Sequence, residues 1–143
     1  MSKPSSEPGS AVIPAPFAAQ GVAIEQVFKS ATTISGQILA LPQGPVGVTV
    51  FRCTIAVGTA LPSHRHAFPR YGYVLAGTLR LTNEQTGSVR DFIAGDFIIE
   101  SIAQWHSGRN VGSTPLCLLV IDQVPEGVEP TEPKPADGGG GQR

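Results

Sequence analysis

Two histidines one residue apart, His64 and His66, are the side chains of this chain that are best suited to chemistry. In a β-strand, side chains at positions i and i+2 point to the same face, so both imidazoles can be presented to one ion. The third histidine of the chain, His106, lies in the separate stretch QWHSGRN, which a folded-back sheet can bring across. Taken alone, the pair fits a solvated strand face equally well. Taken with His106, it forms a candidate transition-metal site, because imidazole is a common metal ligand.

The wider spacing around the histidines favours the metal interpretation. The first region reads GTALPSHRHAFPRYGYVLAG and the second reads GDFIIESIAQWHSGRN. Over about residues 46 to 122, the chain resembles the cupin superfamily, whose two motifs are G(x)5HxH(x)3-4E(x)6G and G(x)5PxG(x)2H(x)3N. The resemblance implies a small, single-domain cupin, a jelly-roll β-barrel in which His64, His66 and His106 converge on a metal ion and a glutamate completes the set.

Three positions depart from the two motifs. Arg70 stands for the glutamate, Ser101 for the proline and Ala103 for the second glycine. The last two positions shape a turn, but a guanidinium has no lone pair for a cation, so Arg70 cannot be a ligand. Three neutral imidazoles still form a workable site with open positions. Without an anionic ligand, Fe or Zn is the favoured ion, Ni or Cu is compatible, and Mn is disfavoured.

Arg70 has three interpretations. If its side chain points into the cavity, its planar fork can hold the carboxylate or phosphate of a substrate. It can equally form an internal ion pair with Glu100, the acidic residue in the strand that leads into the second motif. In the third interpretation, which we rank below these two, Glu100 itself supplies the missing carboxylate. Gln104 shares strand parity with His106 and is a further candidate for contact with a substrate or with a ligand histidine.

The elements that must position these residues read as strands throughout. Strand-length runs alternate with turns that are rich in Gly, Pro and Asn, which predicts an all-β sandwich or barrel. Within TLRLT, polar and apolar residues alternate as in a strand with one buried face, and NEQTG at 83 to 87 reads as a hairpin loop. AIEQVFKS at 23 to 30 fits a short helix or an edge strand. The runs are VGVTVFRCTIAVG, YGYVLAGTLRLTN, SVRDFIAGDFIIE, QWHSGRN and TPLCLLVIDQV.

The two ends of the chain differ from this central part in composition. Residues 1 to 21 are crowded with Pro, Ser, Gly and Ala, and residues 125 to 143 with Pro, Gly and Glu. Segments of this kind bury too little apolar surface to offset the entropy of ordering. We therefore predict disordered termini around a cupin domain at residues 22 to 124.

The composition of the chain narrows the kinds of partner and environment that are expected. The ten Lys and Arg residues are scattered and the formal net charge is −1, which argues against nucleic acid. Apolar runs such as LCLLVI are too short to span a bilayer, so no membrane association is expected. The two cysteines lie in apolar runs and are interpreted as free thiols, which favours a reducing cytoplasm.

These observations predict a small cupin that binds a divalent transition metal and acts on a small anionic molecule. A non-heme dioxygenase is the first enzymatic hypothesis, by analogy with cupin dioxygenases that act on thiols. The alternative is a non-catalytic cupin that binds a small ligand, or a barrel whose metal site has decayed. The resemblance also implies a homodimer.

Overall fold

The computed structural model describes residues 20–136, and these form strands, turns and irregular segments without a helix. Residues 23–30, which fitted either a short helix or an edge strand, have no regular structure. The strands are β1 (Val46–Ile55), β2 (His64–Arg65), β3 (Arg70–Ala76), β4 (Thr78–Asn83), β5 (Val89–Ile93), β6 (Phe97–Ile99), β7 (His106–Asn110), β8 (Leu116–Pro125) and β9 (Glu132–Pro133).

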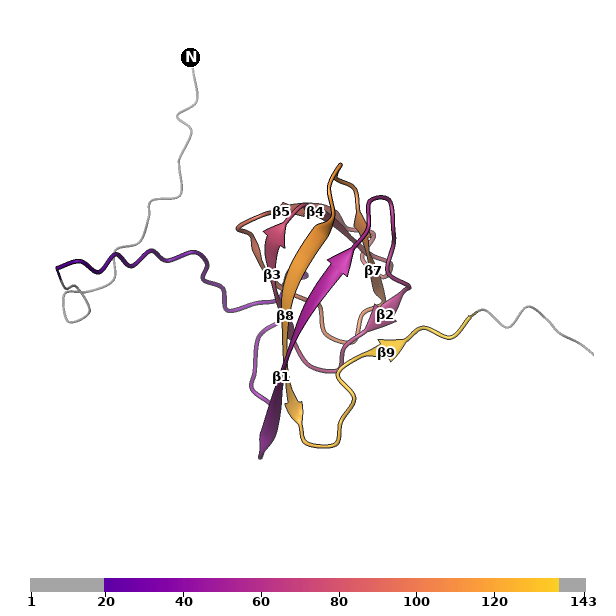
Figure 1. The fold of residues 1–143 in the computed structure, drawn as a ribbon. Helices are drawn as coiled ribbons and strands as arrows, with labels where there is room; N and C mark the ends of the chain where they lie inside the picture. Colours follow the sequence, from indigo (N-terminus) through magenta and orange to yellow (C-terminus); the bar gives the residue numbers. More distant parts are fainter. Residues whose placement is uncertain (1–19, 137–143) are drawn as a thin grey trace, which may run out of the picture.

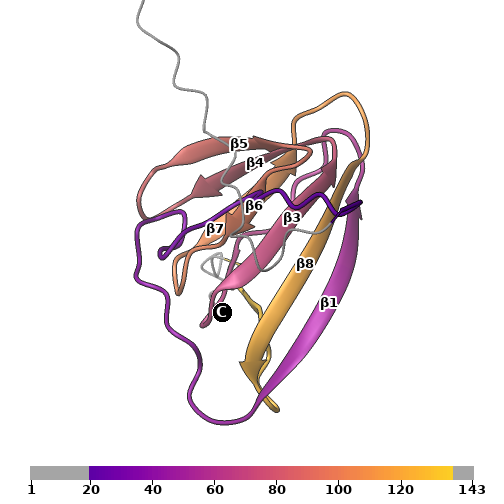
Figure 2. The ribbon, with the colours of Figure 1, turned by 90° about the vertical axis from the view of Figure 1, so that its left-hand side faces the viewer.

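The strands form two antiparallel sheets that face each other (Figures 1 and 2). One has the order β1-β8-β3-β6 and the other the order β5-β4-β7-β2-β9. Neighbours in each sheet are mostly far apart in sequence, as in a jelly roll. The predicted all-β, cupin-type barrel is therefore confirmed. Among the described residues there is no apolar helix of membrane-spanning length.

The core lies between the sheets and follows the period of two that the sequence shows. In β4, Leu79, Leu81 and Asn83 are buried, whereas Thr78, Arg80 and Thr82 are not. The buried apolar residues of both sheets form one cluster: Ile55, Val74, Leu79, Leu81, Phe92, Ile98, Leu116, Leu118 and Val120. Burial of these side chains supplies the main driving force for the fold.

The stretch at 83–87 forms the predicted hairpin loop between β4 and β5. The backbone N–H of Gly87 donates to the carbonyl of Asn83 at 2.9 Å, and Gly87 has a positive φ of 74°. The Asn83 side-chain oxygen accepts from the backbone N–H groups of Gln85 and Thr86, both at 3.0 Å. Such capping of a turn by an asparagine is common, and here it holds the loop beside His106.

The C-terminal segment is where the structure differs from the predicted disorder. Residues 125–136 are part of the described structure, and β9 pairs with β2 in the register His64↔Pro133 and Arg65↔Glu132. The segment lies along β2 at the edge of the five-stranded sheet (Figure 1). Backbone pairing and ion pairs, which composition does not reveal, hold it there. The remaining parts of the predicted disordered ends, residues 1–19 and 137–143, lie outside the described residues.

Candidate metal centre

Four side chains from three neighbouring parts of the barrel meet at one point. His64 lies on β2 directly opposite His106 on β7, His66 follows β2, and Glu100 follows β6. The imidazole centroids are 4.6 to 5.0 Å apart. One ligand atom of each of the four residues lies within 4.8 Å of all the others. The structure thus brings together the three predicted histidines and adds a carboxylate.

Each imidazole is oriented by a hydrogen bond on the side away from this point. All three Nδ1 atoms lie next to a backbone carbonyl oxygen, to which only a protonated nitrogen can donate. Each Nδ1 therefore carries the proton, and each Nε2 presents its lone pair to the cluster. The acceptors are the carbonyls of Pro62 for His64 at 2.7 Å, Pro130 for His66 at 3.0 Å and Gln104 for His106 at 2.8 Å.

The atoms that face the centre are buried and have no hydrogen-bond partner in the structure. These atoms are Nε2 of His66, Nε2 of His106 and Oε2 of Glu100. The Glu100 oxygen is 2.8 Å from the His66 nitrogen and 3.6 Å from the His106 nitrogen. Lone pairs this close and this deeply buried are costly unless a proton or a cation lies between them. This donor set therefore fits a divalent cation.

The electrostatics of the cluster also favour a divalent cation. Burial opposes ionisation of Glu100, but its contacts with His106 and His66 outweigh burial and lower the pKa of the carboxyl group. Burial likewise disfavours a charged His106, yet the neighbouring Glu100 raises the pKa of that imidazole. For His64, burial dominates and lowers the pKa. Negative charge is thus retained where a cation would sit.

Glu100 reaches the cluster because it is the cross-strand neighbour of Arg70. The backbone N–H of Glu100 donates to the carbonyl of Arg70 at 2.8 Å, which continues the β3–β6 pairing from Tyr71↔Ile99. Arg70 holds the position at which the cupin motif has its glutamate. The carboxylate has therefore moved to the adjacent strand, directly across the sheet. This arrangement matches the interpretation that sequence alone ranked last.

Arg70 pairs with Asp122, not with Glu100. Its Nε and Nη2 donate to the two carboxylate oxygens of Asp122, both at 2.7 Å, and Nη2 also donates to the Thr131 hydroxyl at 2.9 Å. Arg70 and Asp122 are directly opposite each other on β3 and β8, and both side chains are largely buried. These two guanidinium nitrogens are therefore engaged within the protein. Asp122 was missed, although it is the only acidic residue in LCLLVIDQV.

Gln104 and Ala103 form hydrogen bonds with two of the three histidines. The Gln104 carbonyl accepts from His106, and its side-chain oxygen accepts from Asn83 Nδ2 at 2.9 Å. Ala103, at a glycine position of the motif, has a φ of 55° and donates its N–H to the His66 carbonyl at 2.7 Å. Both residues are hydrogen-bonded to candidate ligand histidines, and neither lines the pocket next to His106.

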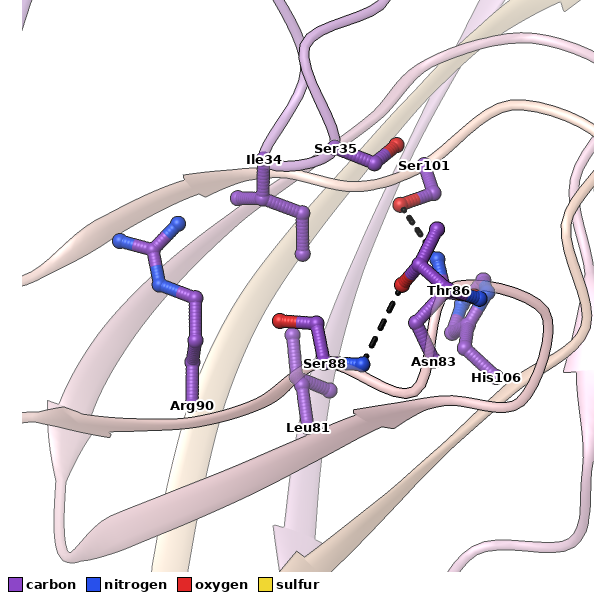
Figure 3. Close-up of a pocket in the computed structure, with 9 residues that line it drawn as sticks. All are labelled: Ile34, Ser35, Leu81, Asn83, Thr86, Ser88, Arg90, Ser101 and His106. Atoms are coloured by element: carbon purple, nitrogen blue, oxygen red, sulfur yellow. Dashed lines mark hydrogen bonds between the residues drawn. The ribbon is translucent and has the colours of Figure 1, made fainter.

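A pocket of about 260 Å³ opens onto the cluster on the His106 side (Figure 3). Its wall has an apolar part, formed by Ile34 and Leu81, and hydroxyl groups from Ser35, Thr86 and Ser88. The guanidinium of Arg90 lies at the end of the pocket away from His106 (Figure 3). The guanidinium carbon of Arg90 lies 5.2 Å from the centroid of the Phe92 ring, and no carboxylate of the described residues pairs with Arg90. Sequence reasoning did not identify this residue, because nothing local shows that β5 borders the site.

Comparison with known proteins agrees with this fold. Residues 51–122, about half of the chain, match the Cupin_2 family, described as a cupin domain. The chain is a cupin. The matched region contains both histidine motifs and Glu100, and it ends at Asp122. β9 and the segment before it therefore lie outside the residues of this cupin that match the family.

Solved structures share the fold of this cupin. The formate complex of oxalate decarboxylase from Lactobacillus farciminis is 21% identical, with a TM-score of 0.52, over 60% of this chain and 26% of that one. DMSP lyase DddQ from Ruegeria pomeroyi is 18% identical, with a TM-score of 0.52, over 61% and 43%. The protein BH2720 from Bacillus halodurans is 20% identical, with a TM-score of 0.51, over 58% and 67%.

These similarities concern the barrel alone. The cupin spans about a quarter of the oxalate decarboxylase and less than half of the lyase. No curated protein sequence matches this chain. The chemistry of the site therefore depends on residues that these comparisons do not explain.

Proposed function

We propose that this cupin binds one divalent transition-metal ion through Nε2 of His64, His66 and His106 and a carboxylate oxygen of Glu100. The observation that carries the proposal is the convergence of buried donor atoms that have no partner within the protein. Metal–nitrogen bonds of about 2.0–2.1 Å would need only small movements of atoms that already lie this close. A decayed metal site would not be expected to keep all four donors in place.

Glu100 changes which ions are compatible. The expectation that Mn is disfavoured depended on the absence of an anionic ligand, and the carboxylate in the cluster removes that reason. A set of three imidazoles and one carboxylate suits Mn, Fe and Zn alike, so we no longer rank Mn below the others. When bound, such an ion would polarise a substrate oxygen or, if it is redox-active, support oxidation.

Metal content is the direct test of the site. Protein purified without a histidine tag should contain close to one equivalent of metal after loading. His106→Ala and Glu100→Gln should each weaken binding by about 10-fold or more, because each removes one of four ligands. Asp91→Asn removes a surface carboxylate that pairs with Arg80, and it serves as the control. Trace metal in the parent, or equal metal in all four proteins, would contradict the proposal.

The pocket supports a small anionic molecule as the ligand. An anion held by Arg90 at one end would place its apolar middle against Ile34 and Leu81 and its other end next to His106. Guanidinium binds carboxylate or phosphate well, and its preference increases in a partly enclosed site. Arg90 thus takes the anchoring role that the sequence suggested for Arg70. The pocket volume favours a compact acid of few carbon atoms.

A panel of short mono- and dicarboxylic acids and phosphoesters tests the anchor. Binding to the metal-loaded protein, measured by calorimetry, should identify an acid whose affinity falls at least about 10-fold in Arg90→Gln. Arg109→Gln is the control, because Arg109 is an exposed arginine in the same sheet whose side chain donates to the Gly58 carbonyl. Equal loss in the two variants would exclude Arg90 as the anchor.

Oxidation of the bound acid by O₂ is the first reaction to test. Uptake of O₂ by the iron-loaded protein, assayed with thiols, oxo acids and phenols, would make the cupin a non-heme dioxygenase. If a ligand binds tightly and remains unchanged with every loaded metal, the non-catalytic binding role is the correct one. The dioxygenase hypothesis has less support than before, because it was based on a three-histidine set without a carboxylate.

We also propose a homodimer in a reducing cytoplasm. β1 is an edge strand with outward-facing, exposed Val48 and Val50, a surface that a second copy could cover. Sedimentation of the parent and of Val50→Glu tests this proposal, since the charge should shift a dimer towards monomer.

Cys53 and Cys117 form no disulfide in the described structure, in line with a reducing compartment.

A further inference from the structure

One of the three metal-facing imidazoles is oriented differently from the other two. His64 and His106 donate from Nδ1 to the carbonyl two residues before them, so their orientation is set within their own segments. His66 donates instead to the carbonyl of Pro130, 64 residues away in sequence. The Thr131 hydroxyl lies 3.3 Å from the same Nδ1 atom. The orientation of one candidate ligand thus depends on the C-terminal segment.

We call this segment, residues 126–134, the C-terminal strap. Hydrogen bonds and ion pairs attach it to the rest of the barrel. Backbone pairing joins β9 to β2, and the Lys134 N–H donates to the Ser63 carbonyl at 2.9 Å. Glu132 accepts two hydrogen bonds from Arg65, at 2.8 and 3.0 Å. Lys134 Nζ lies 2.8 Å from Glu84 Oε2. The strap is therefore attached mainly through exposed, polar contacts that can open locally.

The same strap reaches the buried ion pair beside the centre. Thr131 accepts a hydrogen bond from Arg70, which pairs with Asp122. The strap residues Pro130 and Thr131 are half-buried, in contrast to the exposed residues before and after them. Its inner side thus contacts a candidate ligand and the ion pair, while its outer side forms salt bridges in solvent. Opening the strap would remove the acceptor that keeps the proton on Nδ1 of His66.

We propose that docking of the C-terminal strap is energetically coupled to metal binding through His66. A docked strap fixes the ring orientation and the tautomer that present Nε2 to the ion, and an undocked strap leaves the imidazole free to rotate and to change tautomer. Loss of such an outer partner typically lowers metal affinity about 10- to 100-fold. Because coupling is reciprocal, metal binding must strengthen docking by the same factor. This inference rests on the proposed metal site and concerns residues beyond the family match.

Charge reversal on the exposed side of the strap tests the coupling without touching a ligand. Glu132→Lys in the full-length protein places two cations against each other at the Arg65 contact, and the dissociation constant for Zn²⁺ or Co²⁺ should rise about 10- to 100-fold. The matched control is Asp91→Lys, which breaks a bidentate pair with Arg80 of similar length and exposure on β4 and β5. Equal dissociation constants for the parent and both variants would overturn the inference.

Rescue separates positioning from a general loss of stability. The double variant Arg65→Glu with Glu132→Lys restores an ion pair in swapped order, and its metal affinity should return to within a few fold of the parent. Arg65→Glu alone should resemble Glu132→Lys. The absorption spectrum of the Co²⁺-loaded protein at saturation reports ligand geometry, and it should change in the single variants and recover in the double variant. Failure of the swapped pair to recover the affinity would show that docking is not the cause.

The parent protein allows the reciprocal measurement without any substitution. Hydrogen exchange at the Lys134 amide, which is bonded to Ser63, should slow on adding Zn²⁺ by the same factor that Glu132→Lys loses in affinity. Trp105, the only tryptophan, lies 4.3 Å from the Arg65 guanidinium and 6.0 Å from Lys134 Nζ, so its fluorescence reports docking independently. A parent that binds no metal refutes both proposals. A parent that binds metal with unchanged exchange at Lys134 refutes only the coupling.

Discussion

Arg70 and Asp122 form a buried ion pair next to the candidate metal centre. Both carboxylate oxygens of Asp122 are bonded, and its side chain is 3% exposed, against 16% for Arg70. A buried pair of this kind adds little net stability compared with an apolar pair, but removal of one partner leaves an uncompensated charge. The pair engages the Arg70 side chain with Asp122, while the Glu100 carboxylate lies 2.8 Å from Nε2 of His66.

Asp122→Ala should therefore be strongly destabilising. The expected loss in the free energy of unfolding is about 3–5 kcal/mol, because the Arg70 guanidinium would remain buried without its carboxylate. Asp91→Ala breaks a pair whose side chains are 46% and 44% exposed, so solvent screens the charges and the loss should be much smaller. Urea denaturation measures both. Similar losses for the two variants would mean that Arg70 finds another partner or reaches solvent.

At the scale of elements, turns with unusual backbone angles hold the ligand-bearing strands. Gly77, between β3 and β4, has a φ of 86°, and an added Cβ would lie 2.8 Å from Leu116 Cα and 2.9 Å from the Pro115 carbonyl oxygen. Ala103, before β7, also has a positive φ but carries a side chain. Position 77 thus requires glycine because of its backbone angle and because a side chain would collide with Pro115 and Leu116. Position 103 accepts alanine at the energetic cost of a left-handed backbone.

Gly77→Ala should destabilise the barrel by about 2–5 kcal/mol. A left-handed backbone costs an L-residue about 1–2 kcal/mol, and forcing a methyl group against backbone adds about 1–3 kcal/mol. Gly87→Ala is the control for the first cost alone, since Gly87 has a φ of 74° and nothing within 4 Å of an added Cβ. If thermal unfolding gives equal losses for both variants, the close approach of Leu116 does not contribute.

Ala103→Gly is expected to act in the opposite direction. Glycine removes the left-handed penalty of about 1–2 kcal/mol and adds about 0.4–1 kcal/mol of unfolded-chain entropy, so the variant should gain about 0.5 kcal/mol. Metal affinity should not fall, because the N–H that donates to the His66 carbonyl is retained. Chemical denaturation and metal titration check the two parts. A loss of about 1 kcal/mol would contradict a strained Ala103.

At the scale of the whole molecule, two sheets and the C-terminal strap enclose one centre from different sides. The four candidate ligands lie on β2 and β7, directly after β2, and directly after β6 of the other sheet, and the strap lies along β2 through β9. The strap depends on two carboxylates, Glu132 and Glu84. The hydrogen bond to Arg65 lowers the pKa of Glu132, and hydrogen bonds to Lys134 and Ser63 lower the pKa of Glu84.

These pKa shifts predict that acid releases the strap. A carboxylate whose pKa is lowered on docking stabilises the docked state fully above its unfolded pKa of about 4.3, and this contribution is lost as pH falls through the lower folded value. In metal-free protein, the emission of Trp105 should differ between the parent and Glu132→Lys at pH 7 and converge as the pH falls below the lowered pKa of Glu132. A difference that persists at low pH would show that other contacts hold the strap.

The strands, the barrel and three of the four candidate donors could be predicted from the amino-acid sequence. A period of two in TLRLT fixes which side chains face inward, and the spacing of His64 and His66 puts both imidazoles on one side. The two motifs locate His106 as their partner. These are local properties, readable within a strand or from a known spacing, so they did not require the register between strands.

The partners across strands depend on the register of the folded barrel. The pairing of β3 with β6 and β8 brings Glu100 beside Arg70 and Asp122 opposite it, so Arg70 pairs with Asp122 and not with Glu100, which was one of its three interpretations. The pairing of β9 with β2 likewise brings Pro130 to His66, against a composition that predicted disorder. Register between distant segments follows from packing of the entire barrel. For that reason the sequence could name Glu100 only as the last of three interpretations, and it did not reveal the Arg70–Asp122 pair or the strap.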